Sequence, residues 1–467
     1  MTRKNISSLK VPDLLKNFLE QYPKIEFIKC QFADMQGNTR EVTTTYQQLL
    51  TNGTTSVDGS SVFGKIIPPT ESDMLLVPDF ATLYPLPWDP NTASVICNVF
   101  HPPESEDAPI KPFAGCGRSI LQKVVSRMEI LIRKNLPKTL ANAKIIKMRA
   151  YFAPEVEFLL LPKKYDWTGI HRDCNLKNNY YFLPMYGDRD LAHQEIINYL
   201  GMMGLKKEKY HTEVTSLQCE IGIGHGNVLK IADGTMTIKY IIEYVASKYG
   251  FRASFIPKFN EAVNGSGMHV HQNLSTTVSE NGQEIKINLF FDPACPDGLS
   301  DLGRHYIAGL MKYSREITAI TNPLPVSYKR LVPDAEAPTY ISWDWLNRTA
   351  LCRGHSKGTK KVRIEYRSPD PKCNPYLAFA AMLSAGLSGI EEKLQLRPND
   401  NRNFYEDHSG VKELPGNLGE ALAEMNQSKM LRKWLGKFVI DNLYKLGSNL
   451  WKEESRQVTD VDIERHL

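Results

Sequence analysis

The segment AYFAPEVEFLLL (residues 150–161) sets two glutamates into an apolar run, and this pattern restricts the fold more than any other feature of the chain. Successive side chains of a strand point to opposite faces, so Glu155 and Glu157 share one face while Val156 and Phe158 turn to the other. The apolar face of such a strand needs helices packed against it, whereas the carboxylate face can stay polar. The segment therefore predicts a sheet with one buried face and one polar, functional face.

The segments NGSGMHVHQN and VRIEYRSPD repeat this alternation. In the first, His269 and His271 share one face of a strand that follows a glycine-rich turn. In the second, one face carries the charged residues Arg363, Glu365 and Arg367. Each fragment alone also fits an ordinary solvated strand face. Together they predict an α+β fold whose antiparallel sheet has helices on one side.

Two more glutamates, Glu213 and Glu220, lie seven residues apart in YHTEVTSLQCEIGIG. Because seven is odd, an unbroken strand would point their side chains to opposite faces. If both glutamates serve one site, a turn must separate them. We therefore expect two strands joined by a turn in this segment.

The N-terminal part of the chain has the pattern of a separate domain. Residues 25–50 contain two β-rich runs joined by a turn-like sequence, Met-Gln-Gly-Asn, which predicts a hairpin. A proline-rich passage over 85–112 follows, and we expect it to separate two domains, 1–110 and 111–467. Beyond it, RSILQKVVSRMEILIRK has the spacing of an amphipathic helix, and helical and strand-like segments alternate from there on.

Composition excludes several classes of protein. Of 467 residues, 42% are hydrophobic and 23% charged, which is typical of globular domains and excludes a largely disordered or fibrous chain. The net charge of +5 is small for this length, so bulk attraction to nucleic acid or membrane is not indicated. The apolar stretch 376–390 is too short to span a bilayer. The eight cysteines form no C-x-x-C pair, and as reduced thiols they predict a cytoplasmic protein.

The stretch 329–367 concentrates positive charge. It holds four acidic and nine basic residues, the latter being Lys329, Arg330, Arg348, Arg353, Lys357, Lys360, Lys361, Arg363 and Arg367. Nucleic acid is the generic partner of such a segment. The arginines follow no helical register, however, and guanidinium forks that grip phosphate and carboxylate are the better interpretation. A nucleotide is therefore the expected ligand, although no P-loop and no Rossmann G-x-G-x-x-G is present.

The candidate donors are carboxylates with one or two imidazoles and no thiolate. Such a hard, oxygen-dominated set favours Mg²⁺ or Mn²⁺ over zinc. Parallel carboxylates such as Glu155 and Glu157 repel one another unless a cation lies between them.

The motifs above, taken in order, resemble the type I glutamine synthetase family over almost the whole chain. The matching segments are VDGSS (57–61), ESDM (71–74), PEVEF (154–158), TEVTSLQCE (212–220), NGSGMHVH (264–271), SYKRLVPDAEAPTYISW (327–343), NRTALCR (347–353) and RIEYRSPDPKCNPYLAFAAML (363–383). The resemblance implies an N-terminal β-grasp domain and a catalytic domain with a curved antiparallel sheet. It also implies ligation of L-glutamate and ammonia, with ATP as co-substrate, to give L-glutamine through γ-glutamyl phosphate.

The resemblance further implies a role for each matching residue. Two metal sites would be formed, one by Glu157, Glu213 and Glu220 and the other by Glu155, His269 and Glu365. Substrate binding would involve Asn264, Gly265, Arg330 and Arg367. The ATP side would involve His271, Arg353, Lys360 and Arg363, with Arg348 compensating phosphate charge. Glu336 would close the site, and Asp58 would bind ammonium in a neighbouring subunit of a homo-oligomer, typically a dodecamer of two rings.

Several positions depart from the family pattern near the expected substrates. Thr212 replaces a histidine, and Leu217 stands where a glycine is common. A glutamate–amine ligase acting on a polyamine or alkylamine is therefore an alternative, although such relatives tend to lose the acid that Asp58 retains. A non-catalytic structural homologue is a second alternative, which the complete ligand set opposes. A nucleic-acid-binding protein is a third, opposed by the acids expected opposite the basic stretch.

Overall fold

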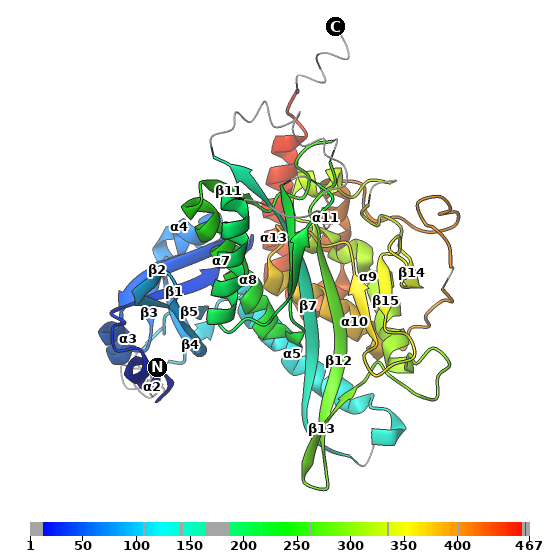
Figure 1. Cartoon of the computed structure of the whole chain (residues 1–467), viewed down its shortest axis with the longest axis horizontal. Helices are drawn as coiled ribbons and strands as arrows, with labels where there is room; N and C mark the ends of the chain where they lie inside the picture. Colours follow the sequence, from blue (N-terminus) through cyan, green and yellow to red (C-terminus); the bar gives the residue numbers. More distant parts are fainter. Residues whose placement is uncertain are drawn as a thin grey trace.

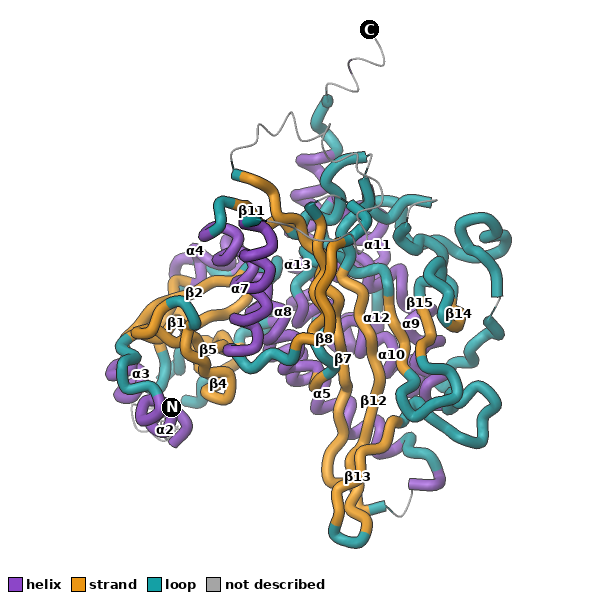
Figure 2. The backbone as a smooth tube through the Cα atoms, in the orientation of Figure 1, coloured by secondary structure: helices purple, strands orange, loops and turns teal. Residues whose placement is uncertain are grey.

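The computed structural model describes residues 13–105, 108–140, 143–163, 187–215, 217–261, 263–333, 336–399, 401–459 and 463. Two sheets organise these residues, one near the N-terminus and a larger one in the remainder of the chain (Figures 1 and 2). This is the α+β architecture expected from the sequence, and the two sheets are described in turn.

The N-terminal sheet has the strand order β2-β1-β5-β4-β3, with β6 paired to β5. Most neighbours are antiparallel, whereas β1 and β5 run parallel. The strands are β1 (Phe27–Ala33), β2 (Thr39–Thr45), β3 (Thr55–Asp58), β4 (Asp73–Leu86), β5 (Asp89–His101) and β6 (Lys111–Pro112). The helical segments are α2 (Asp13–Gln21), α3 (Tyr46–Asn52), α4 (Gly59–Phe63), η1 (Gly64–Ile66) and η2 (Pro69–Glu71).

The hairpin expected within 25–50 is confirmed, since β1 and β2 pair antiparallel around a turn. The Asp34 carboxylate accepts from the backbone N–H groups of Gln36 and Asn38 at 3.0 and 2.9 Å. Gly37 has φ +86°, and a Cβ there would approach the backbone Cα of Asn374 to 2.6 Å. Glycine is therefore required both by the turn and by the close contact with Asn374, far along the chain.

The proline-rich passage over 85–112 contributes strands to the N-terminal sheet. Pro85 is the penultimate residue of β4, Pro90 is the second residue of β5, and Pro112 is the last residue of β6. Proline is tolerated at strand ends because the missing N–H removes few ladder hydrogen bonds there. The expected boundary at residue 110 thus falls just before β6.

The larger sheet has the order β14-β15-β16-β12-β7-β9-β8. Its pairs are antiparallel except β14 with β15, and β10 and β11 add to β7 while β13 adds to β12. The strands are β7 (Lys144–Pro162), β8 (Lys207–Thr212), β9 (Gln218–Ile223), β10 (Gly226–Asn227), β11 (Phe251–Ser254), β12 (Met268–Glu280), β13 (Gln283–Asn288), β14 (Trp343–Trp345), β15 (Cys352–His355) and β16 (Arg363–Tyr366).

Helices cover one face of this sheet, as Figures 1 and 2 show for α5, α8, α9 and α10 behind β7 and β12. The helical segments of this part are α5 (Gly117–Lys134), η3 (Lys138–Leu140), α7 (Asp188–Met202), α8 (Val228–Lys248), α9 (Asp301–Thr321), η4 (Pro325–Lys329), α10 (Pro375–Glu391), α11 (Leu418–Gln427), α12 (Lys429–Trp434) and α13 (Lys437–Glu454). The apolar stretch 376–390 forms the buried body of α10. Within the described ranges, no helix has the length and apolarity needed to cross a membrane.

The tight packing of α10 against α9 explains its small residues. A Cβ on Gly309 of α9 would lie 2.3 Å from the carbonyl oxygen of Ala385, and one on Gly389 would lie 2.1 Å from that of His305. The two helix backbones can approach this closely only because glycine stands at the contact. This layer supports the apolar face of β7 and β12, where Val156 and Val270 are fully buried.

Candidate active site

Strand register aligns the polar residues of five neighbouring strands on one face of the large sheet. Glu155 of β7 lies opposite His269 of β12, and Glu157 lies opposite Glu220 of β9. On the other side, Glu365 of β16 lies opposite His271 of β12 and opposite Arg353 of β15. Side chains directly opposite in an antiparallel pair share a face. The alternation seen in the sequence is thereby converted into one continuous polar row.

The turn expected between Glu213 and Glu220 is present, and it brings the two carboxylates together. β8 and β9 are antiparallel, and the turn is closed by hydrogen bonds from the Glu213 N–H to the Gln218 carbonyl at 3.0 Å and from the Gln218 N–H to the Thr215 carbonyl at 3.1 Å. Leu217 has φ +69°, a left-handed conformation that favours glycine. The departure from the family pattern at this position therefore carries backbone strain.

We call Glu157, Glu213 and Glu220 the first donor group. Glu213 and Glu220, together with His211, have ligand atoms within 4.8 Å of one another, and Glu157 lies opposite Glu220 on the neighbouring strand. Burial, with repulsion from Glu213 and Glu220, raises the pKa of Glu157 well above its usual value. Burial and the charge of Glu220 likewise raise the pKa of Glu213 to about 7. Carboxyls that hold protons this strongly because they crowd one another would release them to a divalent ion placed between them. The group therefore fits a hard divalent cation.

Glu157 is held from both sides by neutral donors. One of its oxygens, Oε2, accepts from the Gly267 N–H at 2.9 Å and from Gln218 Nε2 at 3.1 Å. The same Gln218 amide also donates to the carbonyl of Gly265 and to Ser266 Oγ. The glycine-rich loop before β12 is thus tied to the first donor group.

Glu155, His269 and Glu365 form the second donor group, and their ligand atoms lie within 4.8 Å of one another. His269 Nδ1 is 3.6 Å from Glu155 Oε2 and 3.5 Å from Glu365 Oε1. Burial would raise the pKa of Glu155, but hydrogen bonds from His269 and His271 outweigh it and lower that pKa well below its usual value. Glu365 is 1% exposed, and despite the opposing effect of burial, Arg367 and His355 hold its pKa far below the usual range.

Arginines surround the second donor group. Arg367 Nη1 donates to Glu365 Oε1 at 2.6 Å, and Arg353 Nη1 donates to Glu365 Oε2 at 3.2 Å. Arg330 is 4% exposed and donates through Nη1 to the carbonyl of Ser368 at 2.8 Å. Arg348 is exposed, and its charge is among those that lower the pKa of Arg353, after burial. The basic stretch 329–367 thus turns several of its arginines inward, towards the carboxylates.

A cavity of about 1580 Å³ adjoins both donor groups. Its lining includes the acidic residues Glu155 and Glu220 and also His271, Lys360 and Arg363. This volume exceeds what a drug-sized ligand needs, and its mixed acidic and basic walls suit a phosphate-bearing molecule accompanied by cations.

Two family models match the chain. One, described as "Glutamine synthetase, beta-Grasp domain", matches residues 24–102, and the other, "Glutamine synthetase, catalytic domain", matches residues 130–466. The chain belongs to the glutamine synthetase family. The members of this family are ATP-dependent ligases that use divalent metal ions, and the two donor groups with the adjoining cavity fit that requirement.

Relatives in the glutamine synthetase family cover nearly the whole chain. The glutamine synthetase of Thermotoga maritima is 34% identical over 466 residues, which is 97% of this chain and 99% of the relative. That of Methanocaldococcus jannaschii is 35% identical over 464 residues, 95% of each chain. Among solved structures, apo GmaS is 26% identical with a TM-score of 0.80 and covers 96% of this chain and 98% of that one. A GmaS/ADP complex, which is 24% identical, shares the fold with a TM-score of 0.81 and covers 97% of this chain and 99% of that one.

Two histidines close to the donor groups were missed by reasoning from the sequence. His211 Nε2 lies 3.1 Å from Glu220 Oε1, and His355 Nε2 lies 2.6 Å from Glu365 Oε2. Both stand on strands at even spacing from a residue already singled out, His211 two before Glu213 and His355 two after Arg353. This alternation was available in the sequence, but the family motifs direct attention elsewhere.

The loops that the family pattern assigns to glutamate lie next to one another. Asn264 Nδ2 donates to Glu336 Oε2 at 2.6 Å. A Cβ on Gly265 would lie 2.5 Å from the carbonyl oxygen of Pro257 and 2.7 Å from Arg330 Cγ, so only glycine fits. Asn264, Gly265, Glu336 and Arg330 are thus neighbours at one end of the polar row.

Asp58 is the one expected site residue that lies apart from this row. It ends β3 in the N-terminal sheet and caps α4, where it accepts from the N–H groups of Ser60 and Ser61 at 2.9 and 3.2 Å. Hydrogen bonds from Ser61 and Ser60 lower the pKa of Asp58 to about 2. In Figure 1, α4 lies on the blue, N-terminal side of the molecule, away from β7 and β12.

Proposed function

We propose that this chain joins L-glutamate and ammonia at the expense of ATP to give L-glutamine, with γ-glutamyl phosphate as the intermediate. The observation that carries the proposal is the row of carboxylates and imidazoles on β16, β12, β7 and β9, flanked by buried arginines and a cavity large enough for a nucleotide. Family membership over nearly the full chain supports the same reaction.

Electrostatics accounts for the chemistry. Phosphoryl transfer to the γ-carboxylate of glutamate must bring two anions together, and positive groups have to offset their repulsion. We assign two Mg²⁺ or Mn²⁺ sites, one to Glu157, Glu213 and Glu220 and the other to Glu155, His269 and Glu365, where the bound ions would neutralise phosphate charge. Arg330 and Arg367 would orient the carboxylates of glutamate. Their burial supports this role, because a buried guanidinium is held in one position.

The nucleotide would occupy the cavity. We assign His271, Lys360 and Arg363 to this side because all three line it, with Arg353 and Arg348 nearby to compensate the charge of the phosphates. Asn264 and Gly265 would receive glutamate, and Glu336 would close over it through its contact with Asn264. Excluding water at this point protects the acyl phosphate from hydrolysis.

The acceptor nitrogen arrives mainly as ammonium, so a carboxylate must bind the cation and help it lose a proton. We assign this to Asp58, whose low pKa keeps it ionised. Because Asp58 lies away from the donor groups of its own chain, it would act at the site of a neighbouring subunit in a homo-oligomer, most simply a dodecamer. The division into domains 1–110 and 111–467 and a cytoplasmic location stay predictions from the sequence.

Phosphate release with glutamate, ATP and Mg²⁺ tests the reaction when ammonium is compared with a panel of alkylamines and polyamines. We expect stimulation by ammonium and formation of glutamine. Stimulation by an amine with none by ammonium would replace the proposal by the amine-ligase alternative. Glu365→Ala should abolish turnover while leaving the oligomer intact, which separates catalysis from a purely structural role.

Mixing two inactive variants tests the shared site. Asp58→Ala and Glu365→Ala each lack one component, but oligomers that contain both can combine an intact Asp58 with an intact donor group at some interfaces. Activity regained after unfolding and reassembling the mixture would support a site between subunits. Equal inactivity of mixed and separate samples would reject it.

A further inference from the structure

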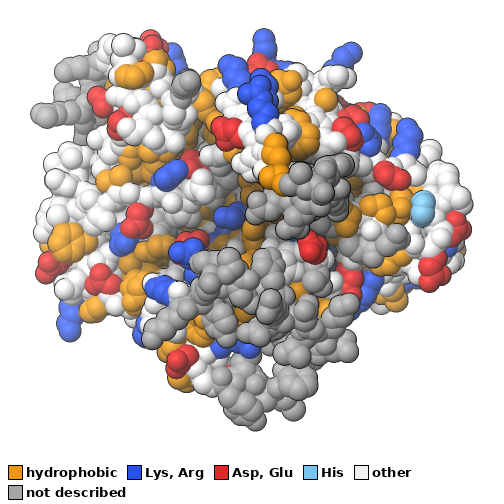
Figure 3. Space-filling model, turned by 90° about the horizontal axis from the view of Figure 1, so that it is seen from above, with side chains coloured by type: hydrophobic (Ala, Val, Ile, Leu, Met, Phe, Trp, Pro, Cys, Tyr) orange, Lys and Arg blue, Asp and Glu red, His pale blue; other side chains and the backbone are white. Residues whose placement is uncertain are grey.

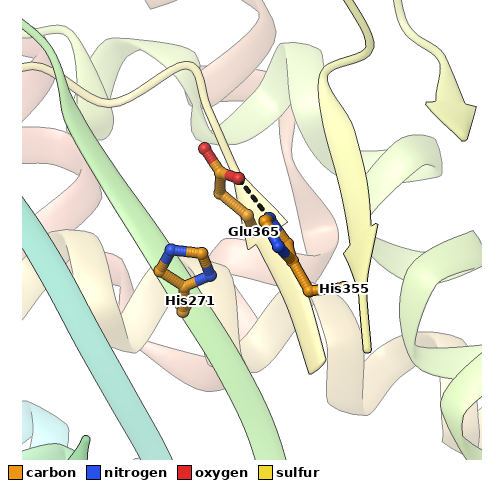
Figure 4. Close-up of side chains that lie close together, drawn as sticks. All are labelled: His271, His355 and Glu365. Atoms are coloured by element: carbon orange, nitrogen blue, oxygen red, sulfur yellow. Dashed lines mark hydrogen bonds and ion pairs between the residues drawn. The ribbon is translucent and has the colours of Figure 1, made fainter. Parts of the chain in front are cut away.

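His355 contacts a metal-site carboxylate, yet the family pattern gives it no role. Its Nε2 lies 2.6 Å from Glu365 Oε2, and Figure 4 shows the two side chains facing each other, with His271 beside them. The strands dictate this contact. Arg353 of β15 pairs with Glu365 of β16, and His355, two residues further along β15, points to the same face.

The contact fixes which oxygen of Glu365 can face a cation. An ionised carboxylate can only accept, so His355 must carry its hydrogen on Nε2 and donate it. Arg353 Nη1 donates to the same Oε2 at 3.2 Å. Two donors use the two lone pairs of Oε2. Oε1 accepts from Arg367 Nη1 at 2.6 Å, which leaves one of its lone pairs to face a cation.

Glu155 is held in the same way by a second histidine. Arg363 Nε donates to His271 Nδ1 at 3.3 Å, so the hydrogen of this imidazole is on Nε2. His271 Nε2 therefore donates to Glu155 Oε1 at 3.1 Å, which leaves Oε2. The remaining oxygens, Glu155 Oε2 and Glu365 Oε1, are the two that lie 3.6 and 3.5 Å from His269 Nδ1. His355 and His271 thus each bind one oxygen of a carboxylate. The other oxygen of each carboxylate is thereby directed towards His269.

We propose that His355 is a positioning residue that holds Glu365 so that Oε1 faces the divalent ion of the second donor group. The inference rests on the proposed function in assuming that this group binds a metal. Partners of this kind orient metal ligands throughout metalloproteins, and losing one lowers metal affinity about 10–100-fold. Because Glu365 is almost fully buried, water cannot replace such a partner in orienting its carboxylate.

The alternative of a third cation bound directly by His271, His355 and Glu365 fits less well. Their ligand atoms lie within 4.8 Å of one another, but both imidazoles carry hydrogen on the nitrogen that would have to bind. Arg353, Arg363 and Arg367 also crowd this point with positive charge.

Two substitutions distinguish these roles. His355→Gln keeps an N–H donor near the position of Nε2 but cannot ligate a metal through its amide nitrogen, whereas His355→Leu removes the donor at similar volume. We would titrate the metal-free full chain with Mn²⁺ and follow free Mn²⁺ by electron paramagnetic resonance. We expect His355→Leu to weaken one of the two binding events about 10–100-fold and His355→Gln to restore it to within a few-fold of the wild type.

Equal loss in both variants would overturn positioning in favour of direct ligation, and wild-type binding in both would remove His355 from the site altogether. His408→Leu is the matched control, since His408 is exposed and stacks on Tyr340, and it should bind Mn²⁺ like the wild type. Thermal unfolding without metal should show one cooperative transition for each variant, which establishes that each is folded. Mn²⁺ binding can be measured without turnover. If the protein makes no glutamine, but His355→Leu weakens Mn²⁺ binding and His355→Gln restores it, the proposed function is rejected and this inference stands.

Discussion

Asn264 donates its side-chain amide to Glu336 Oε2 across 2.6 Å and so joins two loops that are 72 residues apart in the chain. One loop leads into β12 and the donor residue His269, and the other follows Arg330. A single neutral-to-charged hydrogen bond at an exposed position is easily opened. The contact therefore suits a loop that must close over a substrate and later release a product.

Asn264→Asp should open this contact, because it sets two carboxylates against each other. With water admitted, we expect the ratio of phosphate released to glutamine formed to rise, and kcat to fall by about 100-fold if the closed geometry is lost. Glu336→Gln is the matched variant, since its amide oxygen can still accept from Asn264 and keep the loops joined without the charge. A ratio near one in Asn264→Asp would contradict a closing role.

Glu157→Gln should stabilise the metal-free protein and reduce its response to Mg²⁺. The pKa of Glu157 is raised by burial and by Glu213 and Glu220, so its ionised form destabilises the fold increasingly above the ordinary carboxyl pKa. At pH 8 with EDTA, the variant should unfold at a higher temperature than the wild type. Adding Mg²⁺ should raise the melting temperature of the wild type more than that of the variant, which keeps only the second donor group intact. A variant that gains as much from Mg²⁺ as the wild type would remove Glu157 from the metal site.

His193 predicts an acid-sensitive step in stability. It is 1% exposed in α7, and neither ring nitrogen has a hydrogen-bond partner among the described residues. Burial, with the charge of Arg189, lowers its pKa to about 4. Because the unfolded chain binds this proton near pH 6.5 and the folded chain does not, the free energy of unfolding should decrease as pH falls from about 6.5 to 4, by up to roughly 3 kcal/mol.

His193→Leu should lose this part of the pH dependence, as measured by urea unfolding at a series of pH values. The exposed His408 provides the comparison, and His408→Leu should keep the wild-type slope. The same slope in His193→Leu and in the wild type would show that another group is responsible.

Arg118 links the N-terminal sheet to the helices of the catalytic part. Its guanidinium is 3% exposed and binds Asp233 of α8 at 2.8 and 2.9 Å, Asp79 of β4 at 2.7 Å and Asn98 of β5 at 3.0 Å. Arg118→Met keeps much of the volume but leaves Asp233 buried without its cation. We expect a loss of about 3–5 kcal/mol in urea unfolding. Replacing Lys111, whose partner Glu104 is exposed, should change stability by less than about 1 kcal/mol.

Alternation in the sequence predicted which residues share a face, but not which strands meet. Glu155 and Glu157 do face the same way, and the odd spacing of Glu213 and Glu220 does require a turn. The pairing of β7 with β12 could not be predicted this way, because it joins residues 112 to 135 positions apart and depends on the whole sheet. The family resemblance supplied that information for the known motifs.

The proline-rich passage and His355 show two limits of such reasoning. The prolines predict a boundary between domains, but Pro85 and Pro90 lie one residue inside the ends of β4 and β5, where the missing N–H does little harm. His355 stands two residues after Arg353, but a strand of four residues gives no sign of the neighbouring strand with which it pairs. Likewise, the burial of Arg330 follows from packing against the loop of Gly265, which no local pattern reports.

During translation, the order of the strands along the chain determines when each donor group can form. All three carboxylates of the first donor group have been translated by Glu220, whereas the second group waits for Glu365, at the far side of β12. A nascent chain can therefore present the carboxylates of the first donor group to a divalent ion long before the second donor group is complete. Competence for chemistry arrives only once β16 has been synthesised and inserted beside β12.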